Sequence, residues 1–425
     1  MIKRPIKLPD YPRIALVLQG GGALGSYQAG VYEGLADAGI HPNWVAGISI
    51  GAFNSAIIAG NPPEKRVEML HGFWDAICSP PAFQNTLMTN PVNFFDQMMA
   101  PWTEIFKGAE HTMMGSMAAM TAIIKGQENF FKPRLMPPGG GSPDTTSFYD
   151  TTPVLSTLER FADFDRINSG ETRVSLGATN VATGNFVYFD SHDIKLTPKH
   201  VLASGSLPPG FPATEIDGEY YWDGGCVSNT PLEYVLGVSP RKDTLVFQVD
   251  LWSARGPLPV DIFQVNERLK DIQYSSRTRT VTNAIDLAQT MRRVWFDTID
   301  RIPAKVRAKD PWFDEMMRHM MGARYNVIHL IYQNKRTEGH YKDYEFSAET
   351  MRLHWNTGLH DMHETLACEG CLDMPEEGEN FVTFDVHTRQ RSSSGQFTHP
   401  AITPKTTTAP VKTSSNRKPP RQVTT

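Results

Sequence analysis

Between Ile14 and Ala59 the chain repeats one pattern twice, and this repeat restricts the fold more than any other feature of the sequence. A short aliphatic run, first over 14–18 and then over 44–48, stops at a turn that contains glycine. Apolar residues at helical spacing follow each turn, ending near Gly39 in the first case and at Ala59 in the second. Each run has the length of a buried strand, and each turn opens a helix. The order strand, helix, strand, helix predicts a parallel sheet that is covered by helices.

Later segments continue this α/β pattern. Residues 172–190 alternate as two strands around a turn at 183–185. Shorter apolar runs predict further strands over 220–223, 245–251 and 327–332. Beyond Pro257 the spacing favours long amphipathic helices, over about 261–302 with a break or two and over 347–367. The sheet is therefore expected to be followed by a mostly helical region.

The composition is that of a globular protein with a large core, since 40% of the 425 residues are hydrophobic and 20% are charged. No apolar run approaches the roughly 20 residues that cross a bilayer, and the run over 14–18 is too short for the core of a signal peptide. The four cysteines are too few and too scattered for a disulfide framework: Cys78, Cys226, Cys368 and Cys371. We therefore expect a cytoplasmic protein in which Cys368 and Cys371 are two thiols rather than a metal or redox site.

Two segments differ in composition from the rest of the chain. Residues 79–143 hold eight of its 18 methionines among Pro and Gly, which suits either a lid that contacts acyl chains or an ordinary helical subdomain. Residues 388–425 hold seven Lys or Arg and no acid, and they are rich in Ser, Thr and Pro. Such a segment buries too little apolar surface to offset its ordering entropy. We expect a disordered basic tail, and we expect no nucleic acid as a partner.

The second turn carries the motif Gly47-Ile48-Ser49-Ile50-Gly51 between an expected strand and an expected helix. In this context GxSxG is typical of a nucleophile elbow. The glycines leave room where the chain turns sharply, and the serine hydroxyl is held out at the carboxyl end of the strand. The helix that follows directs its first N–H groups and the positive end of its dipole at the site. Ser49 is therefore the predicted nucleophile.

The first turn, Gly20-Gly21-Gly22-Ala23-Leu24-Gly25, satisfies GxGxxG, which has two readings. A dinucleotide-binding turn would require an acidic residue near the end of the next strand, where this chain has Gly47-Ile48-Ser49. An oxyanion hole requires backbone N–H groups that approach the reacting oxygen closely, which glycine permits. The pattern favours an oxyanion hole made by Gly20, Gly21, Gly22 and Gly25.

Taken together, the motifs resemble those of the patatin-like phospholipase family. That family has a glycine-rich oxyanion loop, a GxSxG nucleophile close behind it, and a later Asp-Gly-Gly or Asp-Gly-Ala, and here the third motif is Asp223-Gly224-Gly225. The run 203–212 is similar to the family's loop before the aspartate, and 229–231 is similar to the segment after it. One departure is Leu24, because family members often carry Arg or Lys before the last loop glycine.

The resemblance covers about residues 11–252 and implies a three-layer α/β/α sandwich with a mainly parallel sheet. It implies a Ser-Asp dyad, in which Asp223 accepts the proton of Ser49, and a lipid or ester substrate with no cofactor and no metal. Residues 79–143 would be a lid-like insertion in this hydrolase domain. Residues 253–387 resemble the additional C-terminal domain of some bacterial members, and a tail over 388–425 follows.

The expected function is hydrolysis of lipid carboxylic esters, with peripheral contact to a lipid surface as a further expectation. Three alternatives stay open at this point: a lipid-binding or regulatory protein on a hydrolase scaffold, a hydrolase of storage polyesters, and a nucleotide-binding enzyme.

Overall fold

A ten-stranded, mostly parallel sheet forms the centre of the part of the chain that the structure describes. The computed structural model describes residues 6–78, 122–134, 141–276, 278–320, 322–333, 341–376, 379, 381–387 and 390–393. The sheet consists of β1 (Arg13–Leu18), β2 (Trp44–Ile48), β5 (Arg173–Asn180), β6 (Phe186–Asp190), β7 (Thr214–Ile216), β8 (Glu219–Asp223), β9 (Thr244–Asp250), β10 (Tyr325–Ile331), β11 (Phe381–Asp385) and β12 (Gln390–Ser393). A separate two-stranded sheet pairs β3 (Lys132–Pro133) with β4 (Tyr149–Asp150).

The strand order is β12-β11-β10-β9-β1-β2-β5-β8-β7, with β6 paired to β5 off this path. Neighbours from β11 to β5 run parallel, whereas β6 and β8 are antiparallel to β5 and β12 is antiparallel to β11. The predicted hairpin over 172–190 is thus present as β5 and β6. The parallel centre follows from the strand and helix repeat at the start of the chain, because parallel neighbours need a crossover helix.

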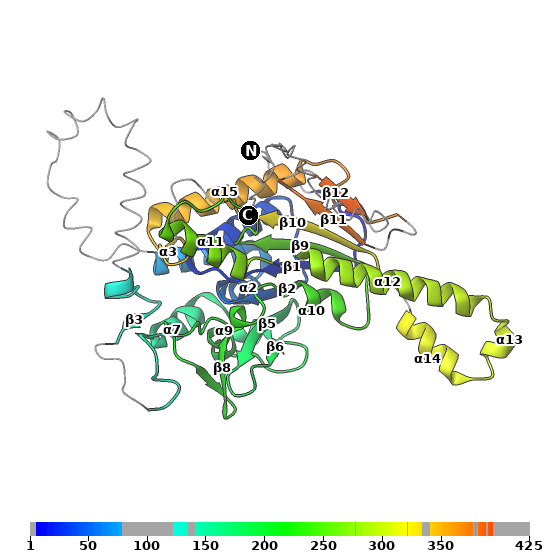
Figure 1. Ribbon diagram of the computed structural model, residues 1–425, viewed down its shortest axis with the longest axis horizontal. Coiled ribbons are helices and arrows are strands. Elements are labelled where there is room, and N and C mark those ends of the chain that lie inside the picture. The colour runs from blue at the N-terminus through cyan, green and yellow to red at the C-terminus, as the bar shows by residue number, and fades with distance from the viewer. Residues whose placement is uncertain are drawn as a thin grey trace, which may run out of the picture. The chain divides into compact units, whose positions relative to one another are not determined.

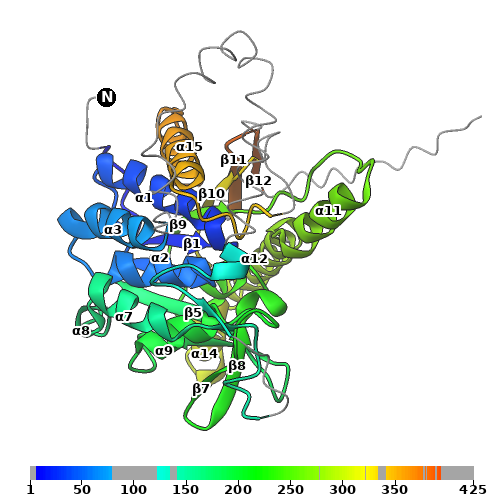
Figure 2. The ribbon, with the colours of Figure 1, turned by 90° about the vertical axis from the view of Figure 1, so that its left-hand side faces the viewer.

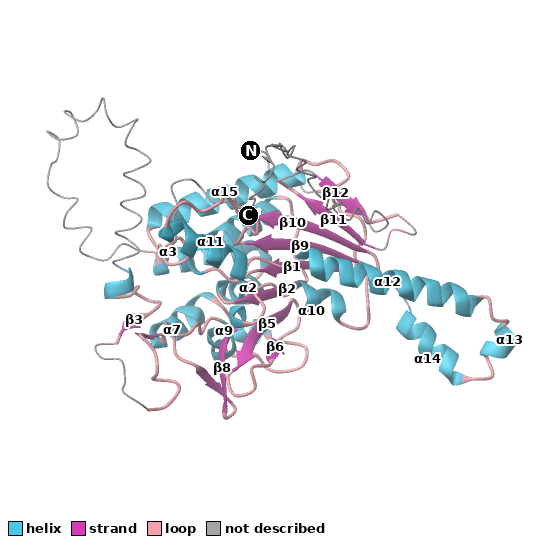
Figure 3. Ribbon diagram, in the orientation of Figure 1, coloured by secondary structure: helices cyan, strands magenta, loops and turns pink. Residues whose placement is uncertain are grey.

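Helices cover both faces of the sheet, which confirms the α/β/α sandwich (Figures 1, 2 and 3). The first core contains α1 (Ser26–Asp37), α2 (Ile50–Ala59), α3 (Arg66–Ile77), α7 (Thr152–Phe161), α8 (Phe164–Ile167), α9 (Pro198–Ser204) and α15 (Ala348–Leu366). The second core, on the other face, contains α10 (Leu232–Gly237) and the start of α12 (Thr278–Asp300). Successive side chains of β1 point to opposite faces of the sheet, so Leu16 belongs to the first core and Val17 to the second.

The region after residue 252 contains the expected additional helices: α11 (Ile262–Tyr274), α12, α13 (Ala304–Arg307), α14 (Pro311–Met320) and α15. It also contributes strands to the main sheet, because β10 pairs in parallel with β9 along its whole length. In Figure 1, α12, α13 and α14 extend away from the sheet. The division of the chain at residue 252 stays a prediction, and the sheet does not break there.

Helix α15 packs closely against α1, on the same face of the sheet as α2, the helix that follows Ser49. Glycines allow this contact: a Cβ on Gly30 would lie 2.0 Å from the carbonyl oxygen of Trp355, and one on Gly358 would lie 2.0 Å from that of Tyr27. The C-terminal region is therefore joined to the N-terminal one through both the sheet and a helix pair.

Two expectations are corrected by the structure. Residues 390–393, which were assigned to a disordered tail, form β12, because they continue the backbone hydrogen bonding of β11 across a turn. Cys368 and Cys371, which were expected as two thiols, form a disulfide, and their Cα atoms lie 5.7 Å apart, within the range such a bond requires.

Other expectations fall on residues that the structure does not describe. The eight methionines of the expected insertion all lie outside the described residues, and so does the tail beyond 393. Among the helices that are described, none is long and apolar enough to span a membrane.

Candidate active site

Ser49 sits on a sharp turn between β2 and α2, as the motif predicted. Its φ of 53° and ψ of −125° are sparsely populated for a residue with a side chain, and such backbone strain is characteristic of functional turns. The turn has no room for side chains beside it: a Cβ on Gly47 would lie 2.2 Å from the Gly51 carbonyl oxygen, and one on Gly51 would lie 2.4 Å from that of Leu18. The flanking glycines thus let β1, β2 and α2 meet behind the serine.

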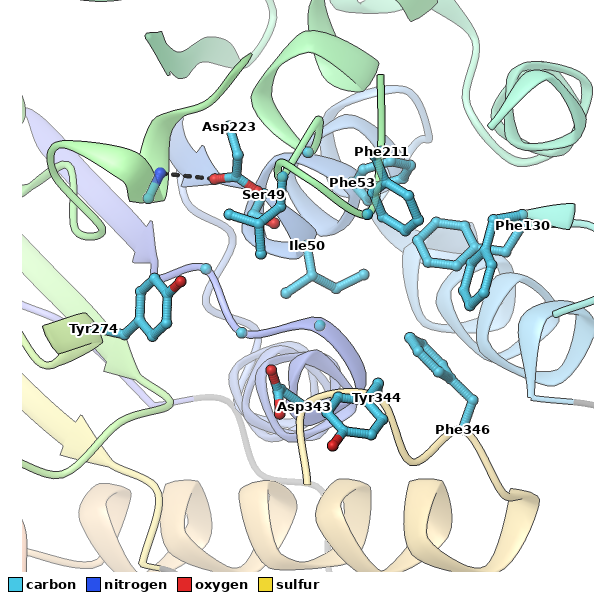
Figure 4. A pocket seen from close by; sticks show the side chains of 18 of the residues that line it. Ser49, Ile50, Phe53, Phe130, Phe211, Asp223, Tyr274, Asp343, Tyr344 and Phe346 are labelled. Atoms are coloured by element: carbon cyan, nitrogen blue, oxygen red, sulfur yellow. Dashed lines mark hydrogen bonds between the residues drawn. The ribbon is translucent and has the colours of Figure 1, made fainter. Parts of the chain in front are cut away.

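Asp223 reaches Ser49 because β8 runs antiparallel to β5. Ile48 pairs with Gly177 of β5, and Asp223 pairs with the next residue of β5, Ala178, so the ends of β2 and β8 lie at the same level. The Ser49 side chain lies beside the Asp223 carboxylate (Figure 4), and this contact lowers the pKa of the carboxyl group. The carboxylate accepts the backbone N–H of Gly225 at 2.7 Å. The structure therefore brings the two predicted catalytic residues together.

Burial governs the protonation of Asp223, whose side chain is almost wholly inaccessible to solvent. Desolvation raises the pKa of Asp223 to about 7, although the Ser49 side chain and the hydrogen bond from the Gly225 N–H act in the opposite direction. A carboxyl group with this pKa exchanges protons near neutral pH, as a general base must.

The expected oxyanion glycines divide into two groups. Gly20, Gly21 and Gly22 line the pocket in front of Ser49. The N–H of Gly20 donates to the carbonyl of Asn229 at 3.3 Å, whereas the N–H groups of Gly21 and Gly22 have no partner among the described residues. Gly25 lies outside the pocket and is a packing position, because a Cβ there would lie 2.5 Å from Ile50.

Side chains that the sequence analysis did not select hold the glycine loop in place. The amide nitrogen of Gln19 donates to Thr230 and to the carbonyl of Tyr274, and its amide oxygen accepts two backbone N–H groups, those of Leu251 and Trp252. The indole of Trp252 donates to the Gly20 carbonyl at 2.8 Å, and the Asn229 side chain donates to the same carbonyl at 3.1 Å. The loop is thereby fixed from β9 and from the segment after Asp223.

The pocket has a volume of about 270 Å³ and is mostly aromatic away from Ser49 (Figure 4). Its apolar end consists of Phe53, Phe130, Phe131, Tyr149, Phe211 and Phe346. These rings contact one another, with centroids 5.7 Å apart for Phe53 and Phe130 and 5.3 Å apart for Phe131 and Phe211. Ligand pockets are commonly about 300–1,000 Å³, so this cavity suits one short or medium apolar chain.

Leu24, the departure from the family pattern, is fully buried in the first core and does not line the pocket. A charged side chain is thus missing from the position where relatives often carry one.

Comparison with known proteins identifies the family. The sequence profile described as patatin-like phospholipase matches residues 16–236, which is half of the chain. The chain belongs to the patatin-like phospholipase family. A second profile, described as patatin phospholipase, matches residues 272–378, so this patatin-like phospholipase has the expected additional C-terminal region. Proteins of this family are lipid acyl hydrolases.

One similar solved structure is VipD from Legionella pneumophila, which has 12% sequence identity to this chain and a TM-score of 0.30. The match covers 87% of this chain and 72% of the VipD chain. The type III effector protein ExoU has 12% identity and a TM-score of 0.27 over 86% of this chain and 53% of its own. No curated protein matches the sequence.

The pocket also contains residues that no sequence motif of this patatin-like phospholipase marks. Tyr274 comes from α11, and Asp343, Tyr344 and Phe346 come from the segment before α15. For Tyr274, Tyr344 and Phe346 the only signal in the sequence is aromatic composition, which is as common in an ordinary core as in a binding site.

Proposed function

We propose that this protein is a serine hydrolase of lipid carboxylic esters, with Ser49 as the nucleophile and Asp223 as the general base. The observation that carries the proposal is the position of the strained Ser49 beside a buried carboxyl group whose pKa is raised to about 7. The aromatic pocket beside Ser49 supports an apolar acyl group as the part of the substrate that is bound.

In the first half of the proposed reaction, the Ser49 oxygen forms a bond to the ester carbonyl carbon while Asp223 takes the hydroxyl proton. The carbonyl oxygen becomes an oxyanion and accepts hydrogen bonds from the N–H groups of Gly21 and Gly22. When the tetrahedral intermediate collapses, the ester C–O bond breaks and the proton passes from Asp223 to the leaving alcohol. The product at this stage is an acyl-serine.

In the second half, water attacks the acyl-serine and Asp223 takes a proton from it. The oxyanion again faces the glycine loop, and its collapse releases a carboxylic acid and returns the proton to Ser49. Both halves need Asp223 to be ionised before each attack, so its pKa sets the pH at which the enzyme works.

Replacing Ser49 by alanine tests this proposal. The wild-type protein should hydrolyse p-nitrophenyl esters and react covalently with a fluorophosphonate probe, and Ser49→Ala should do neither. Ser156→Ala is the matched control, because Ser156 lies on the exposed side of α7. Hydrolysis that persists in Ser49→Ala would show that Ser49 is not the nucleophile. A wild-type protein that binds lipid but reacts with neither reagent would instead support a lipid-binding protein.

A further inference from the structure

The segment Tyr341–Phe346 touches the catalytic loop although it belongs to the C-terminal region of the chain. The carbonyl oxygen of Asp343 accepts the N–H of Ala23 at 2.8 Å, directly after the proposed oxyanion donors. The fit at Gly22 is so close that a Cβ there would lie 2.1 Å from this oxygen. Gly22 also has a φ of +57°, which glycine adopts without strain. The backbone of this segment therefore fits closely against the backbone of the glycine loop.

Helix α11 holds this segment by two ion pairs, one buried and one partly exposed. The ammonium of Lys342 is almost inaccessible to solvent and lies 2.6 Å from the Asp271 carboxylate. The ammonium of Lys270 lies 2.7 Å from both carboxylate oxygens of Asp343, and it also sits 5.1 Å from the ring centroid of Tyr344. Breaking the buried pair of Lys342 and Asp271 would leave a charge without compensation, so this pair strongly favours one position of the segment, and the bidentate contact of Lys270 with Asp343 supports the same position.

The aromatic residues of the segment form one side of the pocket. Figure 4 shows Asp343, Tyr344 and Phe346 along one side, with Ser49 and Asp223 across the cavity from them. The Phe346 ring lies with its centroid 5.7 Å from that of Phe130, and it is part of the apolar end of the pocket. Tyr344 lies between Phe346 and the glycine loop.

We infer that Phe346 and Tyr344 are specificity-determining residues that limit the acyl chain, and that Lys270 is a positioning residue that holds them through Asp343. The inference rests on the proposed function, because it assigns the apolar end of the pocket to the acyl group. An ester bound with its carbonyl at Ser49 and the glycine loop extends its chain toward Phe130 and Phe346. The C-terminal region thereby selects substrates for the catalytic residues of the N-terminal one.

Two substitutions of Phe346 test the acyl-chain role in opposite directions. We measure kcat/KM for p-nitrophenyl butyrate, octanoate and dodecanoate and follow the ratio of the dodecanoate value to the butyrate value. Phe346→Ala enlarges the apolar end and should raise this ratio about tenfold, because roughly two additional buried methylenes contribute such a factor. Phe346→Trp fills the same space and should lower the ratio. Phe148→Ala is the matched control, since Phe148 is exposed and lies outside the pocket.

The outcomes separate this inference from the proposed function. An unchanged ratio in both Phe346 variants, with Ser49 still labelled by the fluorophosphonate at the wild-type rate, would overturn the inference and leave the hydrolase standing. A wild-type protein without hydrolysis or labelling would instead refute the proposed function itself.

The positioning role of Lys270 is tested with the butyrate ester alone. Lys270→Met removes the ion pair with Asp343 and should lower kcat about tenfold with little change in KM, because a small displacement of the glycine loop affects the transition state most. Lys270→Arg keeps the charge and should restore most of kcat. Equal kcat values in the wild type and Lys270→Met would overturn the positioning role.

Discussion

Replacing Asp223 by asparagine should lower kcat/KM about a thousandfold and, at the same time, make the protein more stable at alkaline pH. The buried carboxyl group has a pKa of about 7 in the folded protein, against an ordinary value of 3.8. Because the folded-state pKa is raised, the stabilising contribution of the protonated group is complete below the ordinary pKa and is lost as the pH rises through about 7. A neutral asparagine carries no such pH dependence.

The size of the effect follows from the pKa difference. About three pKa units at about 1.4 kcal/mol each amount to roughly 4 kcal/mol over the whole range. Part of this has already been lost at pH 5, where the unfolded carboxyl group is ionised, and about 2 to 3 kcal/mol remains to be lost between pH 5 and pH 8. The free energy of unfolding of Asp223→Asn, relative to that of the wild type, should therefore increase by about 2 to 3 kcal/mol over this interval.

Urea unfolding of both proteins at pH 5 and pH 8 measures this difference, and hydrolysis of p-nitrophenyl butyrate at the same pH values measures activity. For the wild type, kcat/KM should rise with pH and level off above about 7, as expected for a base that must be ionised. Asp223→Asn should lose about a thousandfold in kcat/KM at pH 8. A stability difference that stays constant between pH 5 and pH 8 would refute the assignment of the raised pKa to Asp223.

Two glycine substitutions extend these tests. Gly22→Ala forces a side chain against the Asp343 carbonyl and should lower kcat about a hundredfold, because it displaces the proposed oxyanion loop. Gly184→Ala is the control, since Gly184 has a similar φ of +69° but lies in open space, and it should leave kcat unchanged. Equal kcat values for the two variants would exclude the loop from catalysis. Gly358→Ala should lower the free energy of unfolding by about 1–3 kcal/mol, because the added methyl group separates α15 from α1. Gly237→Ala, which has open space around it, should not lower it. Urea unfolding measures both variants, and equal stabilities would mean that α1 and α15 are not tightly packed.

The local part of the catalytic site could be predicted from the sequence because it depends on neighbouring residues. The strand, the sharp turn and the helix around Ser49 are all encoded within 44–59, and the structure has each of them. The approach of Asp223 depends instead on the antiparallel pairing of β8 with β5, which joins residues more than forty positions apart. Only the family resemblance indicated it, since a strand pattern does not specify its neighbour in a sheet.

The substrate pocket could not be predicted, because its walls come from distant segments. Phe53 belongs to α2, Phe130 to the chain before β3, and Phe346 to the chain before α15. None of the three belongs to a motif in the sequence, and a phenylalanine is as common in an ordinary buried core as in a binding pocket. Gly25, by contrast, belongs to a sequence motif but does not line the pocket, and it packs against Ile50 instead.

The position of β10 explains how the C-terminal region reaches the glycine loop and the proposed catalytic residues. Strand β10 extends the sheet beside β9, which in turn pairs with β1, the strand that leads into the glycine loop. Parallel neighbours bring their carboxyl ends to the same edge of the sheet, so the chain that leaves β10 emerges beside the loop that leaves β1. The next described segment, Tyr341–Phe346, lies against that loop before α15 returns along α1. A C-terminal region that folded apart from the sheet would not reach the glycine loop in this way. The pairing of β10 with β9 therefore makes a wall of the pocket out of residues that the hydrolase motifs do not include.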